Sequence, residues 1–235
     1  MIYRTDLGKR ECFNIEIKAR CRNPNLIRKI LKRKRAEFIG VDHQIDTYFK
    51  LPPKGGKLKL REGDIEKELI FYKRENRKGP KKSEAILVNN PGNGTKELLA
   101  NLLGITAVVD KRREIFCIKN VRFHIDQVSE LGEFVEIEAS NKPRNNGNSK
   151  NGTLKKEILL KQVNEYMRLF EMKGEDLVSK SYSDMLIEGT RRTSSQKHPA
   201  GIAETRAGNG EPKGNMRWKK TARHGVQTAR TAIVY

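Results

Sequence analysis

Charged side chains recur at every second position within short apolar segments of this chain. In one segment, Glu16 and Lys18 alternate with Ile15 and Ile17. Successive residues of a β-strand point to opposite faces, so such a segment has one charged and one apolar face. Four more segments show the pattern, with charged members Lys57, Lys59 and Arg61; Lys111 and Arg113; Arg122, His124 and Asp126; Glu136 and Glu138.

The signs of these charges indicate what a shared face could bind. Two segments present mainly cations, one presents two carboxylates, and two mix the signs. Crowded lysines and arginines in a partly dry channel repel one another, and a polyphosphate would relieve that cost. Carboxylates suit Mg²⁺ or Mn²⁺, which bridge phosphate oxygens. Charge neutralisation and orientation of the phosphoryl group are the main requirements of phosphoryl transfer.

Two helices are predicted over residues 25–38 and 154–173, because apolar residues recur there at helical spacing. Each helix needs an apolar surface to cover, and the apolar faces of the strands supply one. The charged faces would then line the inside of a curled sheet or barrel. The alternative is an open sheet whose charged face is simply solvated.

The whole pattern predicts an α+β fold with about eight short strands and three to four helices. The strands are expected at 13–20, 41–51, 58–62, 68–74, 83–88, 107–116, 121–128 and 133–139. Turn-rich connections between them favour an antiparallel sheet or barrel. No apolar stretch is long enough to span a membrane, so we expect a soluble, cytoplasmic protein.

The net charge of the 235-residue chain is +20, which predicts a polyanionic partner. Part of the charge lies in residues 189–235, a segment rich in Gly, Ser, Thr, Arg and Lys that is predicted to be a disordered basic tail. Nucleic-acid binding by this tail is conceivable but not favoured. The preceding residues 11–188 are predicted to form one domain.

Sequence signatures of other enzyme classes are absent. The chain has no GxxxxGK[ST] phosphate-binding loop, no HExxH zinc motif, no GxSxG nucleophile motif and no dinucleotide fingerprint. Its three cysteines have no CxxC spacing, which argues against a disulfide framework or a zinc site.

An ordered set of segments resembles the CYTH family, the triphosphate tunnel metalloenzymes, which include class IV adenylate cyclase and thiamine triphosphatase. The segments are NIEIKAR at 14–20, DTYFKLPP at 46–53, KLKLRE at 57–62, ELIFYKRE at 68–75, GPKKSE at 79–84, VVDKRREIF at 108–116, RFHIDQVSELGEFVEIE at 122–138 and SYSDML at 181–186. The resemblance implies an eight-stranded antiparallel closed β-barrel, the triphosphate tunnel, with flanking helices.

The resemblance also implies roles for particular residues. Phosphate groups would be bound by Lys18, Lys59, Arg61, either Lys73 or Arg74, and Arg113, to which the alternation of charges adds Lys111. Mg²⁺ or Mn²⁺ would be bound by Glu16, Glu136 and Glu138, with Asp126 as a further ligand or as the group that orients a metal-bound water. Lys18 and Asp126 are the candidate catalytic residues. Asn14 departs from the family's ExExK signature, because a neutral amide replaces the first carboxylate.

The function expected from this resemblance is metal-dependent hydrolysis of a triphosphate inside the tunnel. The substrate could be inorganic triphosphate, thiamine triphosphate or ATP. One alternative is a class IV-type adenylate cyclase that converts ATP to cyclic AMP. Another is a non-catalytic module that binds polyphosphate or an RNA 5′-triphosphate.

Overall fold

The computed structural model describes residues 13–53, 55–141 and 154–195. Its strands are β1 (Phe13–Arg20), β2 (Glu37–Phe49), β3 (Lys57–Gly63), β4 (Lys67–Arg74), β5 (Lys81–Asn89), β6 (Ile105–Ile118), β7 (Val121–Val128) and β8 (Gly132–Ser140). Its helices are α1 (Pro24–Arg33), α2 (Thr95–Leu103), α3 (Lys156–Leu169) and α4 (Tyr182–Ser195), with a short 3₁₀ turn at Gly174–Asp176.

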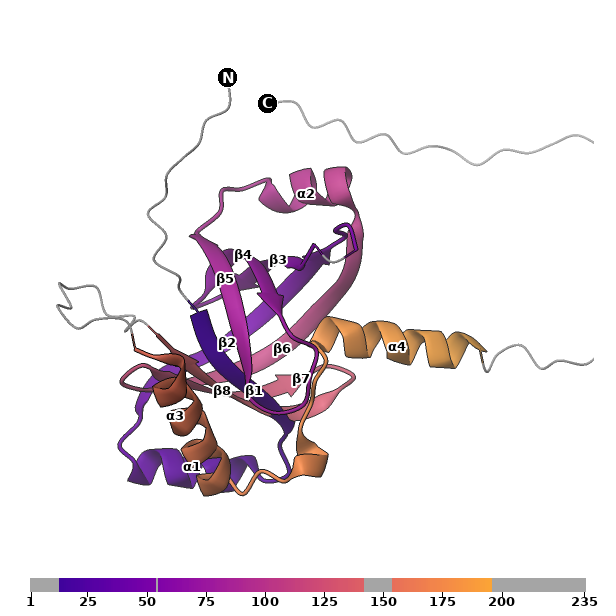
Figure 1. Cartoon of the computed structure of the whole chain (residues 1–235). Coiled ribbons are helices and arrows are strands. Elements are labelled where there is room, and N and C mark those ends of the chain that lie inside the picture. Colours follow the sequence, from indigo (N-terminus) through magenta and orange to yellow (C-terminus); the bar gives the residue numbers. More distant parts are fainter. Residues whose placement is uncertain (1–12, 54, 142–153, 196–235) are drawn as a thin grey trace, which may run out of the picture. The chain divides into compact units, whose positions relative to one another are not determined.

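Within these described residues, the eight strands close into one antiparallel barrel. The order around the barrel is β1-β5-β4-β3-β2-β6-β7-β8, and β8 pairs back onto β1. The strands curl around a common axis, and α1 and α3 lie at one side of the barrel (Figure 1). The expectation of a closed eight-stranded barrel with flanking helices is confirmed.

The apolar faces of β1, β7 and β8 point outward, where α1 and α3 cover them. Ile15 and Ile17 of β1 are 1% exposed and pack in one core with residues of both helices, including Leu31 of α1 and Leu159 of α3. The opposite face of β1 carries Glu16 and Lys18 into the barrel. The alternative of an open sheet with a solvated charged face is therefore wrong.

Helix α1 is shorter than the sequence pattern predicts. The Asn23 side chain accepts a hydrogen bond from the Leu26 amide at 3.0 Å and caps the helix start. Beyond Arg33, however, Arg35 has a φ of +56°, which no α-helix contains. Residues from Glu37 onward instead begin β2 and pair with β6. Phe38 leaves the predicted helical stripe and packs on Phe116, with ring centroids 4.9 Å apart.

The segment after α3 covers one end of the barrel. Leu177 bridges to Ala19, and the Val178 amide donates to the Lys18 carbonyl at 2.9 Å. Tyr182, the first residue of α4, packs in an apolar cluster with Val109 and Phe134. This segment therefore fixes the start of α4 against the barrel.

Helix α4 runs through the predicted domain boundary at residue 188 and ends at Ser195. The first part of the segment predicted to be a disordered tail is thus helical, because Gly189 does not end the helix. The rest of that tail, with its suggested nucleic-acid binding, lies outside the described residues. None of the described helices is long and apolar enough to cross a membrane.

Candidate functional site

The barrel contains a cavity of about 150 Å³ that is partly open to solvent and leaves room for several water molecules or a small anion. Residues from strands all around the barrel line it. The residues predicted as site residues that line this cavity are Glu16, Lys18, Lys59, Arg61, Arg74, Arg113, Glu136 and Glu138. The structure therefore brings most of the predicted site together.

Three predicted site residues do not line the cavity. Lys73 is exposed, because its neighbours Tyr72 and Arg74 take the inward positions of β4. Of these two candidates, Arg74 lines the cavity and Lys73 does not. Lys111 is 1% exposed and lies behind the lining, where its partner is Asp46. Asp126 is also buried behind the lining.

Asp46 of β2 organises the cations of one wall. Its carboxylate accepts hydrogen bonds from Lys59 Nζ at 2.7 Å, Arg61 Nε at 2.8 Å and Lys111 Nζ at 2.6 Å. Burial opposes ionisation of Asp46, but these three cations hold its pKa well below the usual range. One carboxylate therefore fixes three cations, and two of them, Lys59 and Arg61, face the cavity.

A second network joins β1, β6, β7 and β8. Lys18 Nζ lies 2.9 Å from Glu136 Oε1, as expected for direct partners in the β1–β8 register. Arg113 donates to both oxygens of Asp126, its partner in the β6–β7 register, and to Glu136 Oε2 at 2.7 Å. Since Arg113 occupies both oxygens of Asp126, this carboxylate acts here as a support for Arg113.

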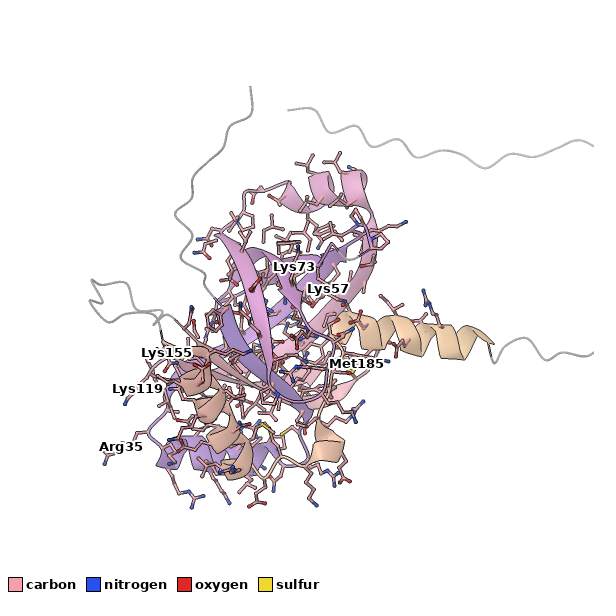
Figure 2. The ribbon with its side chains drawn as sticks, in the orientation of Figure 1. Arg35, Lys57, Lys73, Lys119, Lys155 and Met185 are labelled. Atoms are coloured by element: carbon pink, nitrogen blue, oxygen red, sulfur yellow. The ribbon has the colours of Figure 1, made fainter. Side chains whose placement is uncertain are left out.

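Tyr182 connects α4 to this network. Its hydroxyl donates to Asp126 Oδ2 at 2.8 Å, and the face of its ring lies 3.3 Å from Lys18 Nζ. The same end of α4 is held by Lys57, whose Nζ lies 2.6 Å from Asp184 Oδ1. Figure 2 labels Lys57 near the first turns of α4, where Met185 is also labelled. Helix α4 thus helps to place Lys18, a residue predicted to bind phosphate.

The acidic side of the cavity lies between β1 and β8. Glu16 stands directly opposite Glu138 in the register, and its Oε1 accepts a hydrogen bond from Arg74 Nη1 at 2.7 Å. Asn14 donates through Nδ2 to Glu138 Oε1. The residue that departs from the ExExK signature therefore contacts a predicted metal ligand directly.

Burial shifts the pKa of several groups in the cavity. The pKa of Glu138 rises to about 7 because it is buried and faces Glu16 and Glu136, although Arg122 opposes the rise. Burial and the neighbouring Arg61 lower the pKa of Lys59 to about 8.

Some buried side-chain nitrogens of cavity-lining residues have no hydrogen-bond partner among the described residues. They are Arg74 Nη2, Arg122 Nε and the two ring nitrogens of His124, one of which is a donor and the other an acceptor in the neutral ring. His124 Nδ1 lies 3.5 Å from Glu136 Oε2, which is beyond ordinary hydrogen-bond length. Burial and Arg113 lower the pKa of His124 to about 4, so the ring is neutral at pH 7. Unpaired buried polar atoms are costly and indicate a site for a polar ligand.

The donor set near Glu138 fits a hard divalent cation. Glu16, Glu136 and Glu138 line the same cavity, and Glu138 accepts a hydrogen bond from the neutral side-chain amide of Asn14. A cation would relieve the crowding that raises the pKa of Glu138, and Mg²⁺ and Mn²⁺ prefer such oxygen ligands. Within the described part of the chain, however, there is no group of three or more Asp, Glu, His or Cys side chains that are close enough together to hold a metal ion.

Sequence analysis missed two residues that organise this site. Asp46 belongs to a run in β2, Asp42, Gln44, Asp46 and Tyr48, that has the same alternation used to find the other strands. That alternation could have revealed Asp46. Tyr182 lies within the SYSDML segment, but no sequence spacing indicates that its ring meets Lys18.

Fold and site together define a closed β-barrel with a charged, metal-compatible interior. The chain belongs to the CYTH domain family, which it matches over residues 13–169. No curated protein matches the sequence significantly.

Solved structures share the fold. The PH1012 protein from Pyrococcus horikoshii is 27% identical, with a TM-score of 0.56, and the match covers 73% of this chain and 98% of that one. A conserved hypothetical protein from Pyrococcus furiosus is 19% identical, with a TM-score of 0.56 and coverage of 73% and 98%. An adenylate cyclase candidate from Vibrio parahaemolyticus is 18% identical, with a TM-score of 0.54 and coverage of 74% and 97%.

Proposed function

We propose that this protein is a Mg²⁺- or Mn²⁺-dependent enzyme that hydrolyses a triphosphate inside the barrel. The observation that carries the proposal is a cavity inside the barrel that is lined by at least five cationic side chains, one of which, Arg74, keeps a buried donor without a partner among the described residues. A polyphosphate supplies many acceptor oxygens for these cations, while carboxylates of the same lining would face the metal ion.

The cations would hold the phosphate chain from two sides. Lys59 and Arg61 approach from β3, fixed by Asp46, while Lys18 and Arg113 approach from β1 and β6. Because each of these side chains is anchored by a carboxylate, it is held in place before substrate arrives. Such preorganised charge is the usual source of catalysis in phosphoryl transfer.

The carboxylates of Glu16, Glu136 and Glu138 would hold the metal ion. Bound there, Mg²⁺ or Mn²⁺ would neutralise phosphate charge and polarise the P–O bond. Lys18 lies beside both the predicted metal ligands and the cavity, since its Nζ contacts Glu136 and the residue lines the cavity. It would bind a phosphate oxygen next to the metal ligands. Asp126 would act through Arg113, whose guanidinium it holds.

Hydrolysis breaks one P–O–P bond by attack of water on phosphorus. It requires positioning, charge neutralisation and access of water, which the polar cavity provides. Cyclisation of ATP would also require a sugar hydroxyl to be aligned with the α-phosphate. The activity test therefore includes cyclisation as a measured outcome.

The test is an activity screen of the full chain with Mg²⁺ and with Mn²⁺. The substrates are inorganic triphosphate, ATP and thiamine triphosphate, and the products measured are phosphate, pyrophosphate and cyclic AMP. We expect release of phosphate that EDTA abolishes. Release of pyrophosphate together with cyclic AMP would show that the enzyme cyclises ATP instead of hydrolysing it. Tight binding of triphosphates without any product would favour the non-catalytic module, and neither turnover nor binding would refute the proposal.

A further inference from the structure

A row of exposed basic side chains lies on the outer surface at one end of the barrel. We call it the basic rim, and its members are Lys32, Arg33, Lys34, Arg35, Lys119, Lys155 and Lys156. Arg35 lies between α1 and β2, Lys119 lies between β6 and β7, and Lys155 directly precedes α3. Figure 2 shows these three labelled residues along the same side of the molecule.

Strand pairing brings the first two parts of the rim together. The β2–β6 register pairs Glu37 with Cys117. Arg35 lies two residues before Glu37, and Lys119 lies two residues after Cys117. Both cations are therefore just beyond the same end of one strand pair.

Hydrogen bonds bring the start of α3 to the same end of the barrel. The Asn120 carbonyl, next to the β6–β7 turn, accepts from the Ser140 amide at 3.0 Å. The adjacent Asn141 carbonyl accepts from the Leu154 amide at 3.1 Å, and Lys155 follows directly. The rim is thus one continuous surface.

The rim has no counter-charge in the described part of the chain. None of its seven cations forms an ion pair there, although Glu37 and Glu157 lie in the same segments. Elsewhere on the surface such pairs do form, for example between Lys96 and Glu62 at 2.7 Å. Residues 142–153, which connect β8 to α3, contain three basic residues and no acidic one. Such an uncompensated row of cations attracts a polyanion.

Helix stability explains only part of the rim. Lys32 and Arg33 lie in the last turn of α1, where the helix dipole favours cations. Lys155 and Lys156 lie at the start of α3, where the same dipole disfavours them. Local structure gives no reason for these two lysines, whereas a bound polyanion does.

The surroundings of the rim favour a nucleic-acid backbone over a membrane. A surface that inserts into a bilayer presents large apolar side chains beside its cations. The described segments that carry the rim have no exposed large apolar side chain, and the nearest in sequence are Phe38 and Ile158. Phe38 is 53% exposed, and its ring packs on Phe116 with centroids 4.9 Å apart. An exposed ring held in this way can stack on an unpaired base.

We propose that the basic rim binds the phosphate backbone of a single-stranded nucleic acid. A single strand can follow the curved outer surface of a barrel, and each of its nucleotides supplies a phosphate for a rim cation. Phe38 would stack on one base of the strand. The inference goes beyond the proposed function, because none of these described rim residues lines the cavity.

The test measures binding of the full chain to a fluorescent oligouridylate of about 12 nucleotides at several salt concentrations. Its 5′-hydroxyl end offers no triphosphate to the cavity. The triple variant Arg35→Gln, Lys119→Gln, Lys155→Gln should bind at least tenfold more weakly. The slope of log affinity against log salt should fall by about 2, since each lost phosphate contact removes about 0.7. Binding of inorganic triphosphate should stay unchanged.

The matched control is the triple variant Lys50→Gln, Lys67→Gln, Lys78→Gln, which removes the same charge from exposed residues outside the rim. Lys50 follows β2, at the opposite end of that strand from Arg35. The control should bind the oligonucleotide within twofold of the wild type and with the same salt slope. Equal losses in the two variants would overturn the inference, because affinity would then follow net charge alone. Absence of binding by the wild type would also overturn it.

A footprint on the wild type makes the test independent of how the variants fold. The oligonucleotide should reduce chemical acetylation of Lys119 and Lys155 at least threefold and leave Lys50 and Lys67 unprotected. Lack of protection at the rim would overturn the inference. Sedimentation with phosphatidylserine vesicles tests the membrane alternative. If the rim variant lost vesicle binding but kept its oligonucleotide affinity, the partner would be an anionic membrane and the proposal would be wrong.

Discussion

Lys111 Nζ lies 2.6 Å from Asp46 Oδ2, and both side chains are 1% exposed. Neither group lines the cavity, yet Asp46 also holds Lys59 and Arg61, which do. A buried carboxylate shared by three cations keeps that wall charged and ordered without substrate. Its removal would leave cations buried without compensation.

Asp46→Asn should therefore lower the free energy of unfolding by about 3–5 kcal/mol, the usual cost of breaking a buried ion pair. Urea denaturation measures this loss. Saturating inorganic triphosphate should raise the melting temperature of the variant more than that of the wild type, because the anion replaces the missing charge. Asp110→Asn is the control, since Asp110 pairs with His43 in an exposed contact. Equal stability of Asp46→Asn and wild type would contradict this role.

Affinity for triphosphate should depend on pH through Lys59. Its pKa of about 8 means that the ammonium is complete well below that pH, is half lost at it and disappears as the pH rises further. Binding of inorganic triphosphate should consequently weaken above pH 8, by up to tenfold per pH unit. Lys59→Arg keeps its charge, so the difference between its profile and that of the wild type isolates Lys59. Parallel profiles for the two proteins would assign the dependence to another group.

Asn14 should control how tightly the acidic side binds a metal ion. Asn14→Glu would place another carboxylate beside Glu138, which Asn14 now contacts. We expect Mn²⁺ to bind about tenfold more tightly, since affinity rises with the number of charged ligands. The melting temperature in EDTA should fall, because carboxylates crowd without a cation. Asn14→Gln, which stays neutral, is the control. Mn²⁺ affinity unchanged by the added carboxylate would exclude Asn14 from the metal site.

Tyr182 should stabilise the barrel through two separable contacts. Burial and the adjacent Asp126 raise the pKa of its hydroxyl well above 10, so it remains a donor at neutral pH. Tyr182→Phe removes the hydrogen bond to Asp126 and should cost about 1 kcal/mol. Tyr182→Leu also removes the ring from Lys18 and from the apolar cluster, and should cost about 3 kcal/mol. Thermal unfolding measures both, and equal losses would show that the ring contact contributes nothing.

The strands and most of the residues that line the cavity followed from local pattern, because alternation along a strand assigns each side chain to a face. The pattern allowed a sheet or a barrel, and the closed eight-stranded barrel was what the resemblance to the CYTH family implied. Glu16, Lys18, Arg61 and Glu136 were placed correctly for this reason. Alternation did not show that both oxygens of Asp126 would accept hydrogen bonds from Arg113, since that contact depends on the β6–β7 register. Likewise, the end of α1 depends on the positive φ of Arg35, which its apolar stripe does not reveal.

The central claim is that cations inside the barrel hold a phosphate chain, and calorimetric titration with inorganic triphosphate and Mg²⁺ tests it most directly. The pair of variants is Lys59→Met, which removes a cation from the lining, and Lys29→Met, which removes an exposed cation from α1. We expect Lys59→Met to weaken binding at least tenfold, as for a lost charge-assisted hydrogen bond, and Lys29→Met to leave it unchanged. Equal affinities for the wild type and both variants would contradict binding inside the barrel.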